Sequence, residues 1–458
     1  MELEKAQPGC CYQKVDGKRA LVQTKRDSIR IADIVLPYVK FSHSEFNRIL
    51  SWFNDQVITE TKGVFKDINC IINGFQFDFG TGGIHGSVES QIVYSTDDRV
   101  ILDLDVASYY PNLAIANGLY PEHLGQLFCT IYKDVYEQRK SYAKGTAENA
   151  MLKLALNGVY GDSNNKYSPF FDPQYTMSIT VNGQFLLCML AEVLISSPEV
   201  RMVQINTDGL TIDTPRALLP WVKSVQEWWE QLTNLELEAA EYNRMFIRDV
   251  NNYIAEYTDG KLKRKGAYEY DLGWHQNHSA LIVPKAAEAA LVHGTDIRTF
   301  IQNHDDIFDF FLRAKVPRSN VLEWGGQKVA NIVRYFISHG GHKLEKIMPP
   351  AGPAGKFKKK NGISAAYYAE VLAEVGDAWD ERIHTKNKSV YEERRTGINT
   401  GWNVKLCNDL PQFIADPEFI ERGGNDLADI HEYEEWRRAI NDEWYVKEAE
   451  KLVNLMLD

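Results

Sequence analysis

The spacing of hydrophobic residues divides the chain up to residue 270 into short helices and strands. Three segments carry apolar residues at helical intervals: residues 46–58, 126–144 and 147–161. Three others are extended in pattern and predict one strand and two β-hairpins: residues 99–108, 200–214 and 251–270. The chain therefore has the pattern of an α+β protein, in which a helical hairpin separates the first strand from the first β-hairpin.

The pattern changes after Gly273, where we expect a mainly helical region. A stretch rich in Pro and Gly, "MPPAGPAGKFKKKNG", interrupts it at residues 348–362. The last helix is predicted to be amphipathic, with one apolar stripe made of Tyr445, Ala449, Leu452 and Met456.

Composition narrows the class of protein. The 458 residues suggest roughly three structural units of about 150 residues each. A hydrophobic content of 44% excludes a disordered chain. We find neither an apolar run of the roughly 18 residues that a membrane span needs nor the apolar core of a secretory signal. We therefore expect a cytoplasmic protein with no membrane partner.

The six cysteines show no C-x-x-C spacing, so the sequence indicates neither a zinc site nor a disulfide framework. Adjacent Cys10 and Cys11 are either incidental or redox-active.

The net charge of −12 argues at first against a nucleic-acid partner. Half of it, however, comes from residues 421–458, which hold eleven acidic and five basic residues. Two basic runs contain no acid: residues 261–266, and residues 355–362 with Lys356, Lys358, Lys359 and Lys360. They are either solvated loops or parts of a confined basic groove. If they bind DNA, neutralising the four lysines should weaken duplex binding and flatten its salt dependence.

Carboxylates on predicted strands are the first candidates for chemistry. Asp103 and Asp105 alternate along one strand and so face the same side of it. Asp208 and Gly209 form the predicted turn of the first β-hairpin. Carboxylates on rigid elements suit a pair of Mg²⁺ ions, which stabilise the attacking and leaving oxygens of a phosphoryl transfer. A bare turn is the alternative interpretation of Asp208.

Cations on the predicted helical hairpin are the second group. Lys153, Asn157 and Tyr160 share one helix face, and Arg139 and Lys140 lie on the preceding helix. Such cations suit a nucleoside triphosphate, whose charge must be neutralised before it is attacked. Any one of them could instead be an ordinary surface cation.

Four motifs occur in the order found in family B DNA polymerases. "DVASYYPNL" resembles motif A, "KLALNGVYG" resembles motif B, "INTDGL" resembles motif C, and "RKGAYE" is similar to the element that opens the thumb. Together they cover residues 80–268, and the surrounding sequence also resembles that of phage-type members.

The resemblance implies a right-hand polymerase with an antiparallel-sheet palm, short helical-hairpin fingers and a mainly helical thumb. The implied boundaries are an N-terminal lead-in with a Gly-rich template-side linker (1–84), palm (85–118 and 162–260), fingers (119–161), and thumb with C-terminal region (261–458). Implied partners are primer-template DNA, deoxynucleoside triphosphates and two Mg²⁺ ions, for which Mn²⁺ can substitute. The implied setting is phage genome replication in an infected bacterial host.

The resemblance also implies roles for single residues. Asp105 and Asp208 become the catalytic metal ligands, together with the Val106 backbone carbonyl. Tyr110 becomes the steric gate against a ribose 2′-hydroxyl. The incoming nucleotide would be bound by Arg139, Lys140, Lys153, Asn157 and Tyr160. DNA would be bound by Gly82, Gly83, Lys263, Lys265, Tyr268 and the run Lys356, Lys358, Lys359 and Lys360.

This chain departs from the family pattern at several positions. Asn206 replaces the first Asp of motif C, Gly209 replaces its Ser, and Gly80 stands where the linker has Tyr. Asn206 leaves open an inactive DNA-binding relative, and a primase-like polymerase using ribonucleotides is a second alternative. Only 104 residues precede Asp105, without a D-x-E motif, so we expect no 3′–5′ exonuclease unless a separate chain or other replisome subunit supplies it.

Overall fold

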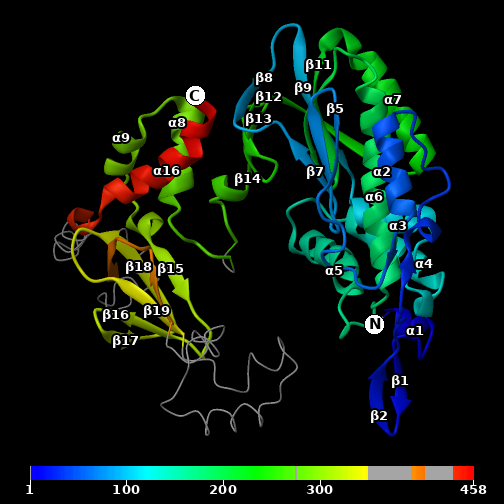
Figure 1. Ribbon diagram of the computed structural model, residues 1–458, viewed down its shortest axis with the longest axis horizontal. Helices are drawn as coiled ribbons and strands as arrows, with labels where there is room; N and C mark the ends of the chain where they lie inside the picture. The colour runs from blue at the N-terminus through cyan, green and yellow to red at the C-terminus, as the bar shows by residue number, and fades with distance from the viewer. Residues whose placement is uncertain (1, 274–275, 349–393, 408–436, 458) are drawn as a thin grey trace, which may run out of the picture. The chain divides into compact units, whose positions relative to one another are not determined.

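A computed structural model of the chain describes residues 2–273, 276–348, 394–407 and 437–457 (Figure 1). It divides into two compact units, the first formed by Met1–Gly266 with Leu455–Asp458 and the second by Ala267–Asn454. Both contain helices and antiparallel strands. The predicted α+β class is confirmed.

A large antiparallel sheet forms the centre of the first unit. Among the described residues it has ten strands in the order β14-β13-β12-β9-β11-β10-β7-β6-β5, with β8 paired to β12. Their bounds are β5 Ile68–Ile72, β6 Phe75–Phe79, β7 Ile84–Ser87, β8 Gln91–Tyr94, β9 Arg99–Val106, β10 Arg201–Asn206, β11 Gly209–Pro215, β12 Leu237–Asp249, β13 Asn252–Tyr257 and β14 Leu262–Lys265. Both predicted β-hairpins, β10–β11 and β13–β14, belong to this sheet.

Three helices lie along one face of this sheet: α2 Ser44–Asn54, α6 Pro173–Leu194 and α7 Leu219–Thr233 (Figure 1). Most residues of α6 are buried, as expected for a helix that is apolar all round. It is long and apolar enough to cross a membrane, with a mean hydropathy of 1.5, but 89% of its apolar window is buried in the structure. A core helix passes the same test.

The predicted helical hairpin is present as α4 Leu127–Lys140 and α5 Ala147–Ser163. The side chain of Thr146 caps α5 by accepting the Asn149 N–H, as its residue type predicts. The Tyr132 hydroxyl donates to the carbonyl of Leu156 at 2.6 Å and ties the two helices together. The short α3 Tyr109–Asn117 connects β9 to this hairpin.

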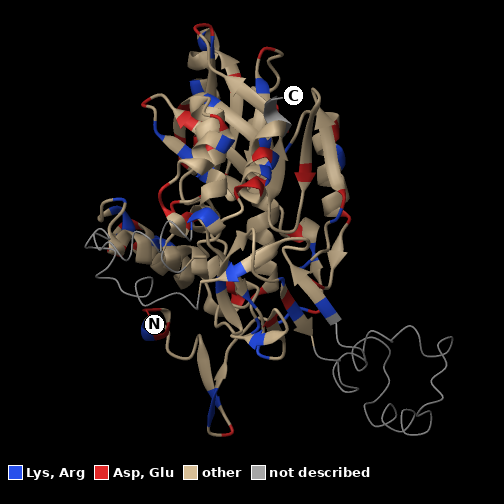
Figure 2. Cartoon of the chain, turned by 90° about the vertical axis from the view of Figure 1, so that its left-hand side faces the viewer, with Lys and Arg blue, Asp and Glu red and all other residues tan. Residues whose placement is uncertain are grey.

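The N-terminal segment forms small elements that the weak sequence pattern did not predict. They are α1 Glu2–Ala6, β1 Tyr12–Val15, β2 Lys18–Leu21, β3 Ile29–Arg30 and β4 Val57–Ile58. The hairpin β1–β2 extends from the first unit with both signs of charge at its tip (Figure 2).

Among its described residues the second unit is not mainly helical, in contrast to the expectation for this region. Its described helices are α8 Ile282–His293, α9 Ile297–Gln302 and α16 Asp442–Leu457. Its described strands form a sheet of β15 Leu312–Lys315, β18 Ile332–Ser338 and β21 Asn403–Leu406, and another of β17 Gln327–Val329, β16 Val321–Trp324, β19 Leu344–Met348 and β20 Arg394–Ile398. The predicted apolar stripe of α16 is confirmed for Tyr445, Ala449 and Leu452, which are buried; the side chain of Met456 lies outside the described part.

The large sheet also includes strands from outside the segments assigned to the palm. Strand β14, assigned to the thumb from sequence, pairs with β13 at the edge of the large sheet. Strands β5 and β6 were assigned to a lead-in region. They pair with each other, and β6 also pairs with β7, at the other edge of the large sheet.

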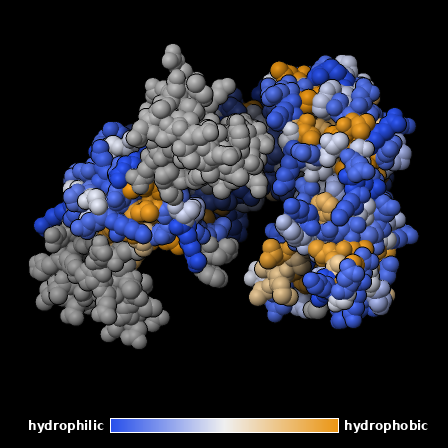
Figure 3. Space-filling view, turned by 60° about the horizontal axis from the view of Figure 1, so that its bottom comes forward, coloured by the Kyte–Doolittle hydropathy of each residue, from blue (hydrophilic) through white to orange (hydrophobic). Residues whose placement is uncertain are grey.

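On the face shown in Figure 3, hydrophobic residues lie in separate areas on a mainly hydrophilic surface.

Candidate active site

Strand β9 carries Asp103 and Asp105 between β11 and β12, near the middle of the large sheet. The N–H of Val106 donates to the carbonyl of Asp208 at 2.8 Å, and Gly209 is directly opposite Asp105 in the strand register. The register therefore places Asp105 and Asp208 at the same end of two neighbouring strands. The hairpin turn presents a carboxylate, as the sequence suggested.

The turn itself is displaced by one residue from its predicted position. Its central residues are Thr207 and Asp208, and Thr207 has the positive φ of 52°. Gly209 instead begins β11, where a Cβ atom would lie 2.1 Å from Asp105 Oδ1 and 2.7 Å from the Leu104 carbonyl oxygen. Glycine is required here by the close approach of Asp105, not by the turn.

Asn206, which departs from the family pattern, stabilises the hairpin through hydrogen bonds of its side chain. Its side-chain amide donates to the carbonyl of Val250 at 3.1 Å and accepts the Thr207 hydroxyl at 3.1 Å. An aspartate would lose the donor and set a negative oxygen against the Val250 carbonyl oxygen. Asn206 thus has a structural role in the hairpin.

A buried network lies beside Asp105. The Asp103 carboxylate is 6% exposed and accepts the Thr211 hydroxyl at 2.6 Å and the Tyr242 hydroxyl at 2.5 Å. Lys263 Nζ lies 3.0 Å from Asp103 Oδ2 and 3.4 Å from Asp105 Oδ2. The ammonium group of Lys263 is therefore engaged by the aspartates, and its contact with DNA stays a prediction.

The network shifts the protonation equilibria of the site. Removal from water, helped by the charge of Asp103, raises the pKa of Asp105 to about 6 although Lys263 opposes the shift. Removal from water likewise raises the pKa of Asp208, against the hydrogen bond from its own backbone and the charge of Lys265. Burial is the largest single effect and lowers the pKa of Lys263, but the charges of Asp103, Tyr253, Asp105 and Tyr242 together outweigh it and raise the pKa overall. A cation placed between Asp105 and Asp208 would relieve their mutual repulsion.

The two aspartates open into a cleft with a volume of about 930 Å³. Nine of the predicted site residues line it: Asp105, Val106, Tyr110, Arg139, Lys140, Lys153, Asn157, Tyr160 and Asp208. Carboxylates from the sheet and cations from α4 and α5 therefore face one space. A smaller pocket of about 380 Å³ shares Asp105 and Asp208 and adds Lys263 and Lys265.

Arg139 is held in place by two residues that sequence reasoning missed. Its Nη1 donates to the Ser108 hydroxyl at 2.7 Å, and its Nε donates to Asn149 Oδ1 at 3.4 Å. Asn149 is 8% exposed and donates in turn to the carbonyls of Arg139 and Tyr142. Ser108 belongs to the motif-A pattern and could have been found there; Asn149 gave no signal.

Tyr110 forms part of the cleft floor. Its hydroxyl donates to the carbonyl of Gly82 at 2.9 Å, and its ring centroid lies 4.5 Å from that of Tyr160. Gly83 is nearby, since a Cβ atom there would lie 3.1 Å from Thr207 Oγ1. The glycine-rich segment thus lies against both the tyrosine pair and the hairpin tip.

Other predicted DNA contacts are not all available. Tyr268 is fully buried in the second unit, where its hydroxyl donates to the carbonyl of Leu452 at 2.7 Å. The side chain has no exposed surface in the structure, and its contact with a primer strand stays a prediction. Lys356, Lys358, Lys359 and Lys360 lie outside the described residues.

The structure changes what we expect of Asp103, which the motif places outside the ligand set. Asp103→Asn should still reduce activity less than loss of Asp105. It should nevertheless destabilise the fold by about 3 kcal/mol, because Lys263 loses its buried partner. Urea unfolding without metal measures this, with Asp259→Asn at an exposed turn as the control. Equal stability of the two variants would contradict the network.

The raised pKa of Asp105 predicts a pH dependence of Mg²⁺ binding. Below about pH 6 the carboxyl holds a proton that competes with the cation. The apparent Mg²⁺ dissociation constant should therefore rise as the pH falls from 8 to 5, approaching about tenfold per pH unit at the acid end. Mg²⁺ titration by calorimetry at several pH values measures it. A constant affinity across this range would contradict the assignment of Asp105 as a ligand.

Comparison with known proteins finds distant similarity to solved structures. No family model and no curated protein matches the chain. A solved structure, the family B DNA polymerase from the hyperthermophilic archaeon Pyrobaculum calidifontis, matches at 13% identity and a TM-score of 0.35. The match covers 74% of this chain and 51% of that one, so the chain spans about half the length of that polymerase. The functional argument rests on the site itself.

Proposed function

We propose that the chain is a template-directed DNA polymerase, which joins a primer 3′-hydroxyl to the α-phosphate of a deoxynucleoside triphosphate and releases pyrophosphate. The observation that carries the proposal is the cleft, where Asp105 and Asp208 face the cations of the helical hairpin. The motif resemblance to phage-type members adds phage genome replication in an infected bacterium as the setting.

The donor set fits magnesium. Asp105 and Asp208 are oxygen donors on neighbouring strands, and the backbone of Val106 lines the same cleft. Bound Mg²⁺ would stabilise the negative charge that develops on the attacking and leaving oxygens. These residues bind no soft cation well, because none of the three supplies nitrogen or sulfur ligands.

The chain's own residues would bind and orient the nucleotide. Arg139, already held by Ser108, offers a fixed guanidinium to the triphosphate. Lys153 and Asn157 are exposed on α5 and line the same cleft, so they can approach the phosphates and the base. Fixing the nucleotide in this way supplies orientation, which is a large part of catalysis in phosphoryl transfer.

Tyr110 is proposed to select the sugar. Its ring is braced by Tyr160 and its hydroxyl by Gly82, so it cannot easily yield to a 2′-hydroxyl. Tyr110→Ala should raise ribonucleotide incorporation about tenfold or more relative to deoxynucleotide incorporation, the scale of a removed steric contact. Single-nucleotide kinetics with both sugars measure the ratio. Equal loss for both sugars would mean that the ring is only structural.

DNA would reach the aspartates past the glycine-rich segment and Lys265. Lys265 is exposed and lines the smaller pocket with Asp208, which suits contact with a phosphate close to the primer end. Gly82 and Gly83 lie on the opposite flank of the hairpin tip, against Tyr110 and Thr207. We assign the template strand to that flank.

Two other functions use the same residues. An inactive DNA-binding relative would bind primer-template without extending it, and a primase-like enzyme would use ribonucleotides without a primer. Primer extension with deoxynucleotides against ribonucleotides, each with and without primer, separates the three. We expect extension only with primer and deoxynucleotides; de novo synthesis from ribonucleotides would overturn the proposal.

A further inference from the structure

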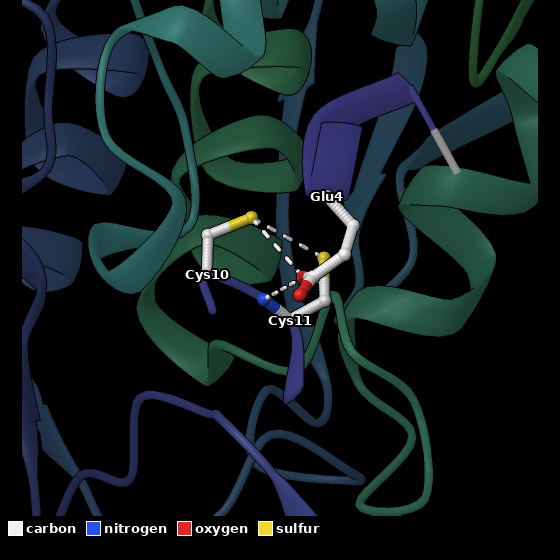
Figure 4. A group of neighbouring side chains, drawn as sticks. All are labelled: Glu4, Cys10 and Cys11. Atoms are coloured by element: carbon white, nitrogen blue, oxygen red, sulfur yellow. Dashed lines mark hydrogen bonds between the residues drawn. The ribbon is translucent and has the colours of Figure 1, made fainter. Parts of the chain in front are cut away.

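A cluster of two thiols and a carboxylate lies in the N-terminal segment, away from the proposed polymerase site. It consists of Glu4 on α1 and the adjacent Cys10 and Cys11 just before β1 (Figure 4). The donor atoms lie within 4.8 Å of one another, and among the described residues no other group of His, Cys, Asp and Glu meets this test. The inference drawn from this cluster does not depend on the proposed polymerase function.

The positions of the donor atoms match those around a tetrahedral ion. The two sulfur atoms are 3.5 Å apart, and Cys10 Sγ is 3.8 Å from Glu4 Oε2. Two thiolates at about 2.3 Å from zinc lie about 3.8 Å apart, and a carboxylate oxygen at about 2.0 Å lies about 3.5 Å from each sulfur. Little movement would bring all three donors to one cation.

The carboxylate is already oriented toward the thiols. Glu4 Oε1 accepts the Gly9 N–H at 2.8 Å, and Oε2 accepts the Cys11 N–H at 2.9 Å. A carboxylate has about four acceptor sites, so these bonds leave room for a cation on Oε2. Backbone donors that fix a ligand's orientation are common around protein-bound metals.

Burial argues against the redox or nucleophilic use that adjacent cysteines could have. Cys10 and Cys11 are 5% and 6% exposed and belong to the hydrophobic core of the first unit. Glu4 is only half-buried and leaves the cluster open to an entering ion.

We propose that Glu4, Cys10 and Cys11 bind one thiophilic divalent cation of the zinc type, with water completing the coordination. Two thiolates and a carboxylate favour zinc or cadmium over magnesium. The absence of a C-x-x-C spacing hid this site from the sequence, because here the ligands are two adjacent cysteines and a glutamate six residues before the first of them.

The cation would cross-link α1 to the loop that follows it, and α1 in turn packs beside the helical hairpin. Leu3 and Glu2 of α1 line an apolar pocket of about 410 Å³ together with Phe128 and Val135 of α4. Cross-linking Glu4 to the loop at Cys10 would hold α1 in this position. The site is thus proposed as a structural staple on the side of α4 and α5 that carries apolar residues.

Cadmium titration of the untagged full chain tests the proposal, in a phosphine reductant and after removal of metals. We expect sulfur-to-cadmium charge-transfer absorption in the ultraviolet that saturates at one Cd²⁺ per chain and is reversed by excess Zn²⁺. Cys10→Ser and Cys11→Ser should abolish it. Glu4→Gln should weaken binding about tenfold or more, the scale of a lost metal partner.

Two controls separate this site from other thiols and from the aspartates. Cys407→Ser removes a buried cysteine of the second unit and should leave the titration unchanged. Asp208→Asn, which disables the proposed polymerase site, should also leave it unchanged. Absence of the absorption in the wild-type chain overturns the proposal, as does its persistence in both Cys10→Ser and Cys11→Ser. Glu4→Gln keeps the side-chain shape, so wild-type affinity in that variant also overturns it.

Discussion

Replacing Asp105 or Asp208 by alanine is expected to reduce primer extension by about 10³-fold or more, because a metal that stabilises the transition state contributes several kcal/mol. The two residues are at the same end of neighbouring strands and face one cleft. Each variant should still bind primer-template, since the lost ligand acts on the reacting phosphate and not on the duplex. Rapid-quench extension and a DNA-binding titration measure the two properties.

The matched control for this pair is Asp213→Ala on β11. Asp213 is a buried aspartate on the strand that follows Asp208; it pairs with Arg99 at 2.8 Å and does not line the cleft. The Asp213→Ala variant should have a lower free energy of unfolding but keep most of the primer-extension rate per folded molecule. Extension by Asp105→Ala or Asp208→Ala near the wild-type rate would show that the metal ligands are wrongly assigned.

Gly209→Ala is expected to have the second largest effect. The added Cβ would lie 2.1 Å from Asp105 Oδ1, 2.7 Å from the Leu104 carbonyl and 3.0 Å from the Asp105 Cα. Rotation of the carboxylate relieves only the first contact, so β9 and β11 must also separate. A displacement of about 1 Å at a catalytic group costs about 10²-fold in rate.

A glycine-to-alanine substitution at a position with free space around it provides the control. Gly340 in the second unit has no neighbouring atom within 4 Å of an added Cβ and no positive φ, so Gly340→Ala should be neutral. Extension rates and thermal unfolding of both variants are compared. A folded Gly209→Ala variant that extends primers at the wild-type rate would contradict the predicted contact with Asp105.

Helices whose apolar residues recur at a clear helical period were predictable from sequence. Helices α2 and α4 follow an apolar stripe, and α5 also has the Thr146 cap, so their positions came out within a few residues. Helix α6 was missed for the opposite reason: it is apolar on every side and so shows no period.

The strands of the second unit could not be read from local sequence. They are short, and some, such as β17 and β20, are mostly polar. Their partners are also distant, as β18 pairs with β21 some 65 residues later. Pairing between distant segments overrides local preference in such strands, which explains why a mainly helical region was expected.

The candidate active site, like the fold, was predictable from sequence only in part. Motif spacing identified Asp105, Asp208 and Arg139, whose side chains the structure brings to one cleft. The residues around them were not identified: Tyr242, which donates to Asp103 beside Asp105, and Asn149, which holds Arg139, meet these side chains only through the fold. Gly209 was assigned to the turn, but its requirement comes from a neighbouring strand.

Single-nucleotide addition by the wild-type chain is the most direct test that the cleft performs template-directed DNA synthesis. Four primer-templates that differ only in the templating base are each incubated with one deoxynucleotide and Mg²⁺, and primer length and pyrophosphate are measured together. The account predicts addition of the complementary nucleotide alone, with one pyrophosphate released per addition and none without Mg²⁺. No addition, or addition that ignores the templating base, would contradict it.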